Sequence, residues 1–251
     1  MKYIITILVF TATIFLACEN SPKEASQTEP AKVPVVDTAL TILNQTIDAH
    51  GGSRYDQAHY SFLFRKKKYT FQNQGKDFRY TVDRSTEGAE VLDTLDQSGF
   101  TRMTNGVEDS LTQKQINGYT GSLNSVIYFA TLPHKLLDPA VNVSYTGTAA
   151  IKGENYDVLE VNFNEEGGGT DHDDEFCYWI NKETRLIDYL AYNYQVNKGG
   201  VRFRSAYNTR NVDGIVFQDY VNYKAPLGTP LIQLPVLFEQ MSNWQHPFKQ
   251  M

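Results

Sequence analysis

Apolar residues recur at two different periods along the chain, and the change of period predicts where helices give way to strands. Near the N-terminus, four of them are spaced as one face of an α-helix: Val36, Leu40, Leu43 and Ile47. Asp37 is a suitable cap for the start of this helix, and Gly51-Gly52 is a suitable stop. From residue 60 onward the period is mostly two, which is typical of half-buried β-strands.

Turn signals divide this second region into short strands. Asn105-Gly106 and Asp213-Gly214 are typical of two-residue hairpin turns. An apolar helix face from Leu123 to Ala130 interrupts the strands and ends before Pro133. The expected strands lie at residues 60–71, 77–84, 99–103, 107–111, 141–145, 149–152, 156–163, 175–180, 186–194, 201–210 and 215–223.

Because helices do not alternate with these strands, a parallel sheet is not expected. The sequence predicts a mainly β, α+β fold in which about ten strands form an antiparallel meander, as an open sheet or an incomplete barrel. No repeat or internal linker divides residues 36–251, so we expect a single domain there.

The first 35 residues have the composition of an export signal and a tether. A basic start precedes an apolar run from Tyr3 to Leu16, which is too short for a membrane-spanning helix of about 20 residues. Phe15-Leu16-Ala17-Cys18 resembles the lipobox at which the lipoprotein signal peptidase cuts. We therefore expect a signal peptide at residues 1–17, acylation of Cys18 that anchors the chain to a membrane, and a flexible tether over 18–35. The alternative is an ordinary secretory signal beside a chance cysteine.

The formal net charge of −6 narrows the choice of partners. A mildly acidic chain is unsuited to nucleic acid, and anionic lipid headgroups are not expected as its main partner. One basic run, Arg65 to Lys68, stands out from this average. On a strand these side chains alternate between faces, so protection of a sheet edge is the first interpretation and contact with anionic lipid the second.

The densest group of possible metal ligands lies between two predicted strands. Asp171, Asp173 and Glu175 alternate as at the start of a calcium-binding loop, and His172 lies among them. The calcium pattern then fails, because Phe176 stands where glycine is required. A solvated acidic loop is therefore the first interpretation. A divalent cation held by Asp171, His172 and Asp173, serving a metal-dependent envelope hydrolase, is the alternative.

Catalytic motifs are not found elsewhere in the sequence. The histidines show neither HExxH nor paired spacing, CxxC does not occur, and the segment Gly51 to Tyr55 lacks the last glycine of a nucleophile elbow. With Cys18 acylated, Cys177 has no disulfide partner and is expected to be a buried strand residue. The sequence therefore predicts a protein that is not an enzyme and needs no cofactor.

Aromatic residues, 14 Phe, 16 Tyr and 2 Trp, are concentrated on the predicted strands. On the last two strands Phe203, Tyr207, Phe217 and Tyr223 alternate with polar residues, so one face of the sheet needs a cover. These four residues are candidates for the wall of a cavity that binds a hydrophobic small molecule or an acyl chain. The alternative is a core filled by the same rings, which would make the chain a structural or interaction module.

Several short segments resemble known lipoprotein families. Ile47-Asp48-Ala49-His50-Gly51-Gly52, followed by strands, is similar to the opening of lipoprotein-sorting and carrier proteins of the LolA/LolB type. Phe129 to Pro139 resembles an LPxKLxDP stretch in an uncharacterised family of Gram-negative lipoproteins. His172-Asp173-Asp174, Trp179 and Asn181-Lys182-Glu183-Thr184 fit the same family.

This resemblance implies a strongly curved antiparallel sheet, a half-barrel, with the N-terminal and mid-chain helices on its concave face. It also implies an outer-membrane lipoprotein, facing the periplasm or the cell surface, whose half-barrel binds a hydrophobic or lipid-like ligand without catalysis. It carries over no catalytic residue, and His50 is expected to be a helix-end residue. The chain departs from the carriers in its longer loops, such as Glu165–Asp174.

Overall fold

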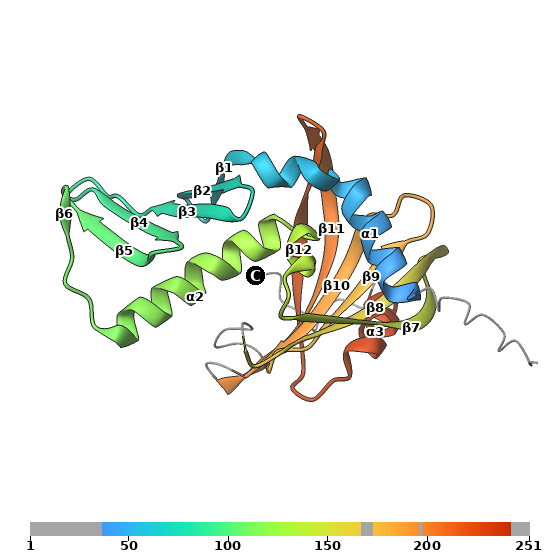
Figure 1. Cartoon of the computed structure of the whole chain (residues 1–251). Helices are drawn as coiled ribbons and strands as arrows, with labels where there is room; N and C mark the ends of the chain where they lie inside the picture. The colour runs from blue at the N-terminus through green and yellow to red at the C-terminus, as the bar shows by residue number, and fades with distance from the viewer. Residues whose placement is uncertain (1–36, 167–172, 196–197, 242–251) are drawn as a thin grey trace, which may run out of the picture. The chain divides into compact units, whose positions relative to one another are not determined.

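Two six-stranded antiparallel meanders make up most of the chain in the computed structural model (Figure 1). In each sheet, strands pair with their neighbours in sequence, as short strands joined by tight turns are expected to do. The first sheet contains β1 (His59–Phe64), β2 (Lys67–Gln74), β3 (Asp77–Asp83), β4 (Val91–Asp96), β5 (Gly99–Thr104) and β6 (Val107–Glu108). The second sheet contains β7 (Val141–Ile151), β8 (Glu154–Phe163), β9 (Phe176–Asn181), β10 (Ile187–Tyr194), β11 (Gly200–Val212) and β12 (Ile215–Ala225).

The mainly β, α+β fold and the antiparallel pairing are confirmed, with two sheets of six strands in place of one sheet of about ten. The structure describes residues 37–166, 173–195 and 198–241. The predicted signal peptide, the acylated Cys18 and the tether that ends at residue 35 lie outside the described residues. Within the described part, no helix combines the length and the apolar character needed to cross a membrane.

Helices cover the sheets and connect them. They are α1 (Thr38–His50), α2 (Gln113–Ala130) and α3 (Leu234–Met241), with the short 3-10 helices η1 (Gly52–Gln57), η2 (His134–Leu137) and η5 (Leu231–Gln233).

The start and the end of α1 are those that the sequence predicts. The Asp37 side chain accepts backbone N–H groups of the first turn, and Gly51 ends the helix with φ of 130°. The buried face overlaps the predicted one at Leu43 and Ile47, but Leu40 is 50% exposed and Ile42 is buried in its place. The buried residues are Ala39, Ile42, Leu43, Thr46, Ile47 and His50.

Both faces of the second sheet are buried. α1 and the end of α2 pack on one face, as predicted, and α3 packs on the other. α1 contacts both edge strands, β7 and β12. A helix of this length is about 20 Å long and six flat strands span about 24 Å, so the sheet curves around the helix. All residues of β9 are buried, including Cys177 as predicted, and burial raises the pKa of its thiol.

The first sheet packs one face on α2, while the residues of its other face are exposed or half-buried. Leu123 and Ile127 of α2 are fully buried in this core. Ile215 and Phe217 of β12 belong to the same core, so the first sheet packs against the start of the last strand of the second. The buried strand residues are Tyr69, Phe71, Tyr80, Val82, Leu95 and Phe100.

The strands and helices differ from the prediction in several places. Residues 60–71 form two strands, because the chain turns at Arg65-Lys66 with φ of 49° and 65°. Residues 141–145 and 149–152 form one strand, β7, with a bulge between Tyr145 and Gly147. Strand β4 and helix α3 are additional elements that the pattern did not predict.

Candidate functional site

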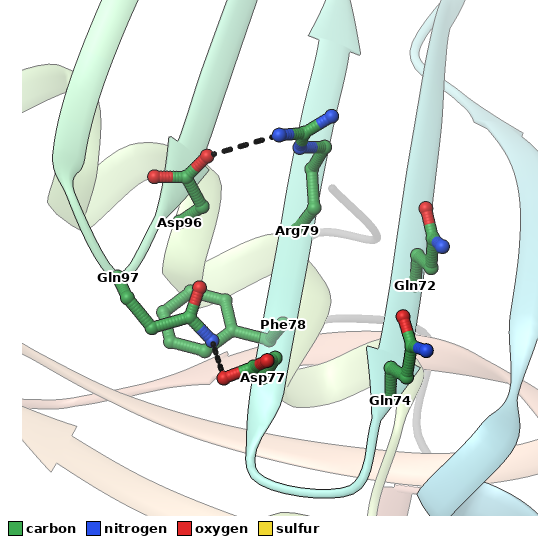
Figure 2. A pocket seen from close by; sticks show the side chains of 7 residues that line it. All are labelled: Gln72, Gln74, Asp77, Phe78, Arg79, Asp96 and Gln97. Atoms are coloured by element: carbon green, nitrogen blue, oxygen red, sulfur yellow. Dashed lines mark hydrogen bonds and ion pairs between the residues drawn. The ribbon is translucent and has the colours of Figure 1, made fainter.

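A pocket of about 350 Å³ on the first sheet has polar walls (Figure 2). Arg79 and Asp96 form an ion pair across it at 3.5 Å, and the Gln97 amide lies 3.4 Å from the Asp77 carboxylate. Its lining residues are Gln72, Gln74, Asp77, Phe78, Arg79, Asp96 and Gln97. The lining includes no histidine, cysteine or hydroxyl side chain, and one of its two carboxylates, Asp96, is paired with Arg79.

The acidic segment around residue 172 is described only in part. Asp171 and His172 lie outside the described residues, and Asp173 is exposed in the turn before β9. The carboxylate of Glu175 accepts a hydrogen bond from the Asn193 side chain at 2.7 Å. In the part of the chain that the structure describes, no three His, Cys, Asp or Glu side chains gather as a metal site. A cation held by Asp171, His172 and Asp173 stays a prediction.

His50 is a structural residue at the end of α1, as predicted. Its Nε2 accepts a hydrogen bond from the backbone N–H of Ile187 in β10 at 3.2 Å. Burial lowers the pKa of His50 from 6.5 to about 4. A Cβ on Gly51 would lie 3.1 Å from backbone atoms of Gly214 and Ile215. The His50-Gly51 pair therefore connects α1 to both β10 and the β11–β12 turn.

The four predicted cavity residues lie in three different surroundings. Phe203 is 2% exposed, and its ring lies 6.5 Å from that of Tyr223 on the face that α3 covers. Phe217 lies in the core of the first sheet, 6.4 Å from the Phe71 ring. Tyr207 is 53% exposed, beside a bulge in β11. The structure thus brings together Phe203 and Tyr223 but separates them from the other two.

A second group of rings lies where the end of α2 meets the second sheet. Ring centroids of neighbouring members are 5.2 to 6.4 Å apart. Phe129, Phe163 and Tyr192 are half-buried, so the group presents ring surface to solvent. We call this group the aromatic cluster, and its members are Tyr128, Phe129, Phe163, Phe176, Tyr178 and Tyr192.

Arg204 of β11 lies among the rings of the aromatic cluster, and no ion pair joins it to a carboxylate of the described residues. Its guanidinium carbon is 3.7 Å from the centroid of the Phe129 ring, and Nη2 donates to the Tyr192 hydroxyl at 2.8 Å. Its Nε is buried and has no hydrogen-bond partner. The same holds for Oδ1 of Asn222, the residue opposite Arg204 in the register of β11 and β12. An unpartnered donor and an unpartnered acceptor therefore lie on neighbouring strands of one face.

A second arginine lies on the same face, two residues earlier. Arg202 is 8% exposed, donates to the Tyr194 hydroxyl and lies 5.0 Å from the centre of that ring. Among the described residues, neither Arg202 nor Arg204 forms an ion pair. A guanidinium held among rings is suited to bind a carboxylate or phosphate through directed hydrogen bonds.

Two tyrosines of the cluster are held as neutral phenols by burial. The Tyr128 and Tyr178 hydroxyls are 2.8 Å apart, and burial raises the pKa of both. Burial also raises the pKa of Tyr220, which lies near Arg204. Neutral phenols, rings and two cations can bind a ligand that has an apolar body and an anionic group.

The fold and this cluster define a class of protein: two antiparallel meanders covered by helices, with a half-exposed aromatic surface beside two arginines that are held by tyrosine hydroxyls and rings. A family model matches residues 57–242, and the chain therefore belongs to a family of unknown function, DUF6503. A search of curated proteins finds no match.

The solved structures that are similar to the chain include the following three. A LolA superfamily protein from Nitrosomonas europaea has 11% identity and a TM-score of 0.46, covering 76% of this chain and 87% of its own. A DUF1329 family protein from Desulfovibrio piger has 11% identity and a TM-score of 0.44, with coverages of 75% and 86%. A domain described as an outer membrane lipoprotein-sorting protein from Vibrio parahaemolyticus has 8% identity and a TM-score of 0.41, with coverages of 74% and 85%. Because the identities are this low, function has to be argued from this chain's own side chains.

Proposed function

We propose that the chain is a non-catalytic lipoprotein of the cell envelope that binds an amphiphilic ligand at the aromatic cluster. The ligand has an apolar body, such as an acyl chain, and an anionic group. The body lies against the half-buried rings of Phe129, Phe163 and Tyr192, and the anionic group is bound by Arg204.

The single observation that carries this proposal is the setting of Arg204. A buried or half-buried arginine is normally paired with a carboxylate, because desolvating the charge is costly. Here the guanidinium contacts the Phe129 ring at 3.7 Å and a neutral hydroxyl instead. An anion beside the half-buried guanidinium would supply the missing counter-charge.

The position of Asn222 adds selectivity to this site. Its unpartnered Oδ1 accepts, while Arg204 donates, so a head group with both a hydroxyl and an anionic oxygen would satisfy both. Exposed ring surface supplies the apolar part of the affinity, since burying it removes apolar area from water. The proposed ligand lies on a half-exposed surface of the second sheet.

Membrane anchorage is part of the proposal. The lipobox-like segment ending at Cys18 supports acylation there, and the polar residues that follow support a tether ahead of α1. The resemblance of the sequence to envelope lipoproteins favours the outer membrane, with the folded part in the periplasm or at the cell surface. A chain held beside a bilayer has acyl ligands within reach.

Replacing Arg204 with Gln is expected to weaken binding of a fluorescent fatty acid by about tenfold or more, because a charge-assisted hydrogen bond is lost. Binding of the corresponding methyl ester is expected to change little, since the ester has no charge to pair. Fluorescence titration of residues 19–251 measures both constants. Arg210→Gln is the matched control, because Arg210 lies on the same strand but pairs with Asp219 at 3.0 Å.

Two results would contradict the proposal. If the wild-type chain binds neither the acid nor the ester, its rings fill a core and the chain is an interaction module. If Arg204→Gln weakens binding of the acid and of the ester equally, Arg204 maintains the structure of the cluster and does not recognise the charge of the ligand.

A further inference from the structure

The tip of the β1–β2 hairpin combines exposed apolar side chains with a run of cations. Leu63 is 78% exposed and Phe64 is 41% exposed. The next four residues, Arg65 to Lys68, are all basic. We call residues 63–68 the hairpin tip.

The turn gives this tip its shape. Arg65 and Lys66 have φ of 49° and 65°, the left-handed values of a two-residue hairpin turn. Such a turn places both side chains at the end of the hairpin, away from the sheet. A long strand would have divided the four cations between two faces, whereas the turn gathers them at one end.

Apolar and basic side chains alternate across the two strands of the tip. In the register of β1 and β2, Leu63 lies opposite Lys68 and Phe64 lies opposite Lys67. The Arg65 guanidinium lies 5.0 Å from the centre of the Phe64 ring. Long basic side chains can lie along apolar groups and keep their charge at the edge, which is the arrangement found at membrane interfaces.

The hairpin behind the tip is well supported. The rings of Phe62 and Tyr69 stack at 5.6 Å, and the Ser61 and Thr70 hydroxyls are 2.8 Å apart. Asp83 of β3 lies opposite Lys68 and is the acidic residue facing the tip in the strand register. One carboxylate opposite four cations in the register of the described strands leaves the tip positive, although the whole chain carries −6.

We propose that the hairpin tip docks on the surface of an anionic phospholipid bilayer. Leu63 and Phe64 enter the boundary between head groups and acyl chains, and residues 65–68 bind lipid phosphates. The negative charge of the rest of the chain favours this one contact, because an anionic surface repels the remainder of the fold. This function is separate from ligand binding at Arg204, and it orients a tethered domain on its membrane.

Co-sedimentation of residues 19–251 with vesicles tests the proposal without the lipid anchor. Binding to vesicles of equal parts phosphatidylglycerol and phosphatidylcholine is expected to exceed binding to pure phosphatidylcholine by about tenfold, and to fall as salt is added. Lys66→Gln with Lys67→Gln should remove most of this preference. Leu63→Ser should weaken binding to the anionic vesicles without removing the preference.

Matched controls separate the tip from general surface properties. Lys76→Gln with Lys114→Gln removes the same charge from exposed positions elsewhere, and Leu227→Ser removes a leucine that is 69% exposed. All three control positions should leave vesicle binding unchanged. Equal loss in the control and tip variants, or no binding of the wild-type chain, overturns the proposal. The second result would leave an acidic protein as the partner of the tip.

Discussion

Replacing Asp93 with Asn is expected to lower the free energy of unfolding by about 3–5 kcal/mol, the usual cost of removing one partner of a buried ion pair. Asp93 is 0% exposed on the inner face of β4. Its carboxylate accepts from Arg102 at 2.6 and 2.9 Å and from Arg84 at 2.5 Å. Hydrogen bonding to Asp93 raises the pKa of Arg102 further above its usual range. The variant would leave two largely buried guanidinium groups without a counter-charge.

The same change should loosen α2 from the first sheet, because the Arg102 guanidinium lies 3.8 Å from the centre of the Tyr119 ring in that helix. Urea unfolding of residues 19–251 measures the loss. Asp96→Asn is the control, since its partner Arg79 is 63% exposed and the pair is 3.5 Å apart. An exposed pair of this kind contributes about 1 kcal/mol or less. An equal loss of unfolding free energy in the two variants would show that the burial of Asp93 does not determine the destabilisation.

Parts of the fold could be predicted from the sequence because they depend on residues that are close together in the chain. Asp37 and Gly51 act within one helical turn, so the start and end of α1 follow from residue type. Asp213-Gly214 forms the β11–β12 turn with φ of 52° and 87°, as this dipeptide favours. The β1–β2 turn has the same positive φ angles but consists of Arg65 and Lys66. Neither residue prefers that conformation, so the turn could not be found.

Strand β4 was missed for a different reason. Inward positions of an antiparallel strand are normally apolar, but Asp93 occupies one of them in the sequence Val91 to Asp96. The strand is stabilised by Arg84 and Arg102, which come from outside it. A pairing between strands cannot be read from the pattern of one strand.

The aromatic cluster could not be predicted for the same reason. It joins the end of α2 to residues of β8, β9 and β10, which are brought together only by register and curvature. The alternation in β11 is visible in the sequence, but it indicates the apolar side of the strand, which includes Phe203 and is covered by α3. The functional candidate is the opposite face, where Arg204 lies among rings that begin with Phe129. One weak signal for an anion site was present in the strands. Arg202 and Arg204 alternate with apolar residues on β11, and the residues opposite them on β12, Lys224 and Asn222, are not acidic.

Acidification should destabilise the fold through His50. Burial lowers the pKa of His50 from 6.5 to about 4, against a smaller opposing effect of the Val216 backbone. Protonation would put a hydrogen on Nε2, the atom that accepts from Ile187. Because the folded pKa lies below the unfolded one, the stabilisation is complete above pH 6.5 and is lost as the pH falls toward 4. The difference corresponds to about 3 kcal/mol.

His50→Gln isolates this effect, because the Gln amide oxygen can accept from Ile187 without titrating. Urea unfolding at several pH values between 6.5 and 4 should show a shallower loss of stability for this variant than for the wild-type chain. His134 also contributes, since burial and then Lys135 lower the pKa of its ring, which stacks on Tyr55 at 4.9 Å. His134→Gln should therefore remove a smaller part of the slope. If both variants lose stability with falling pH as steeply as the wild-type chain, carboxylates and not histidines cause the acid sensitivity. The contact between α1 and β10 then does not depend on pH.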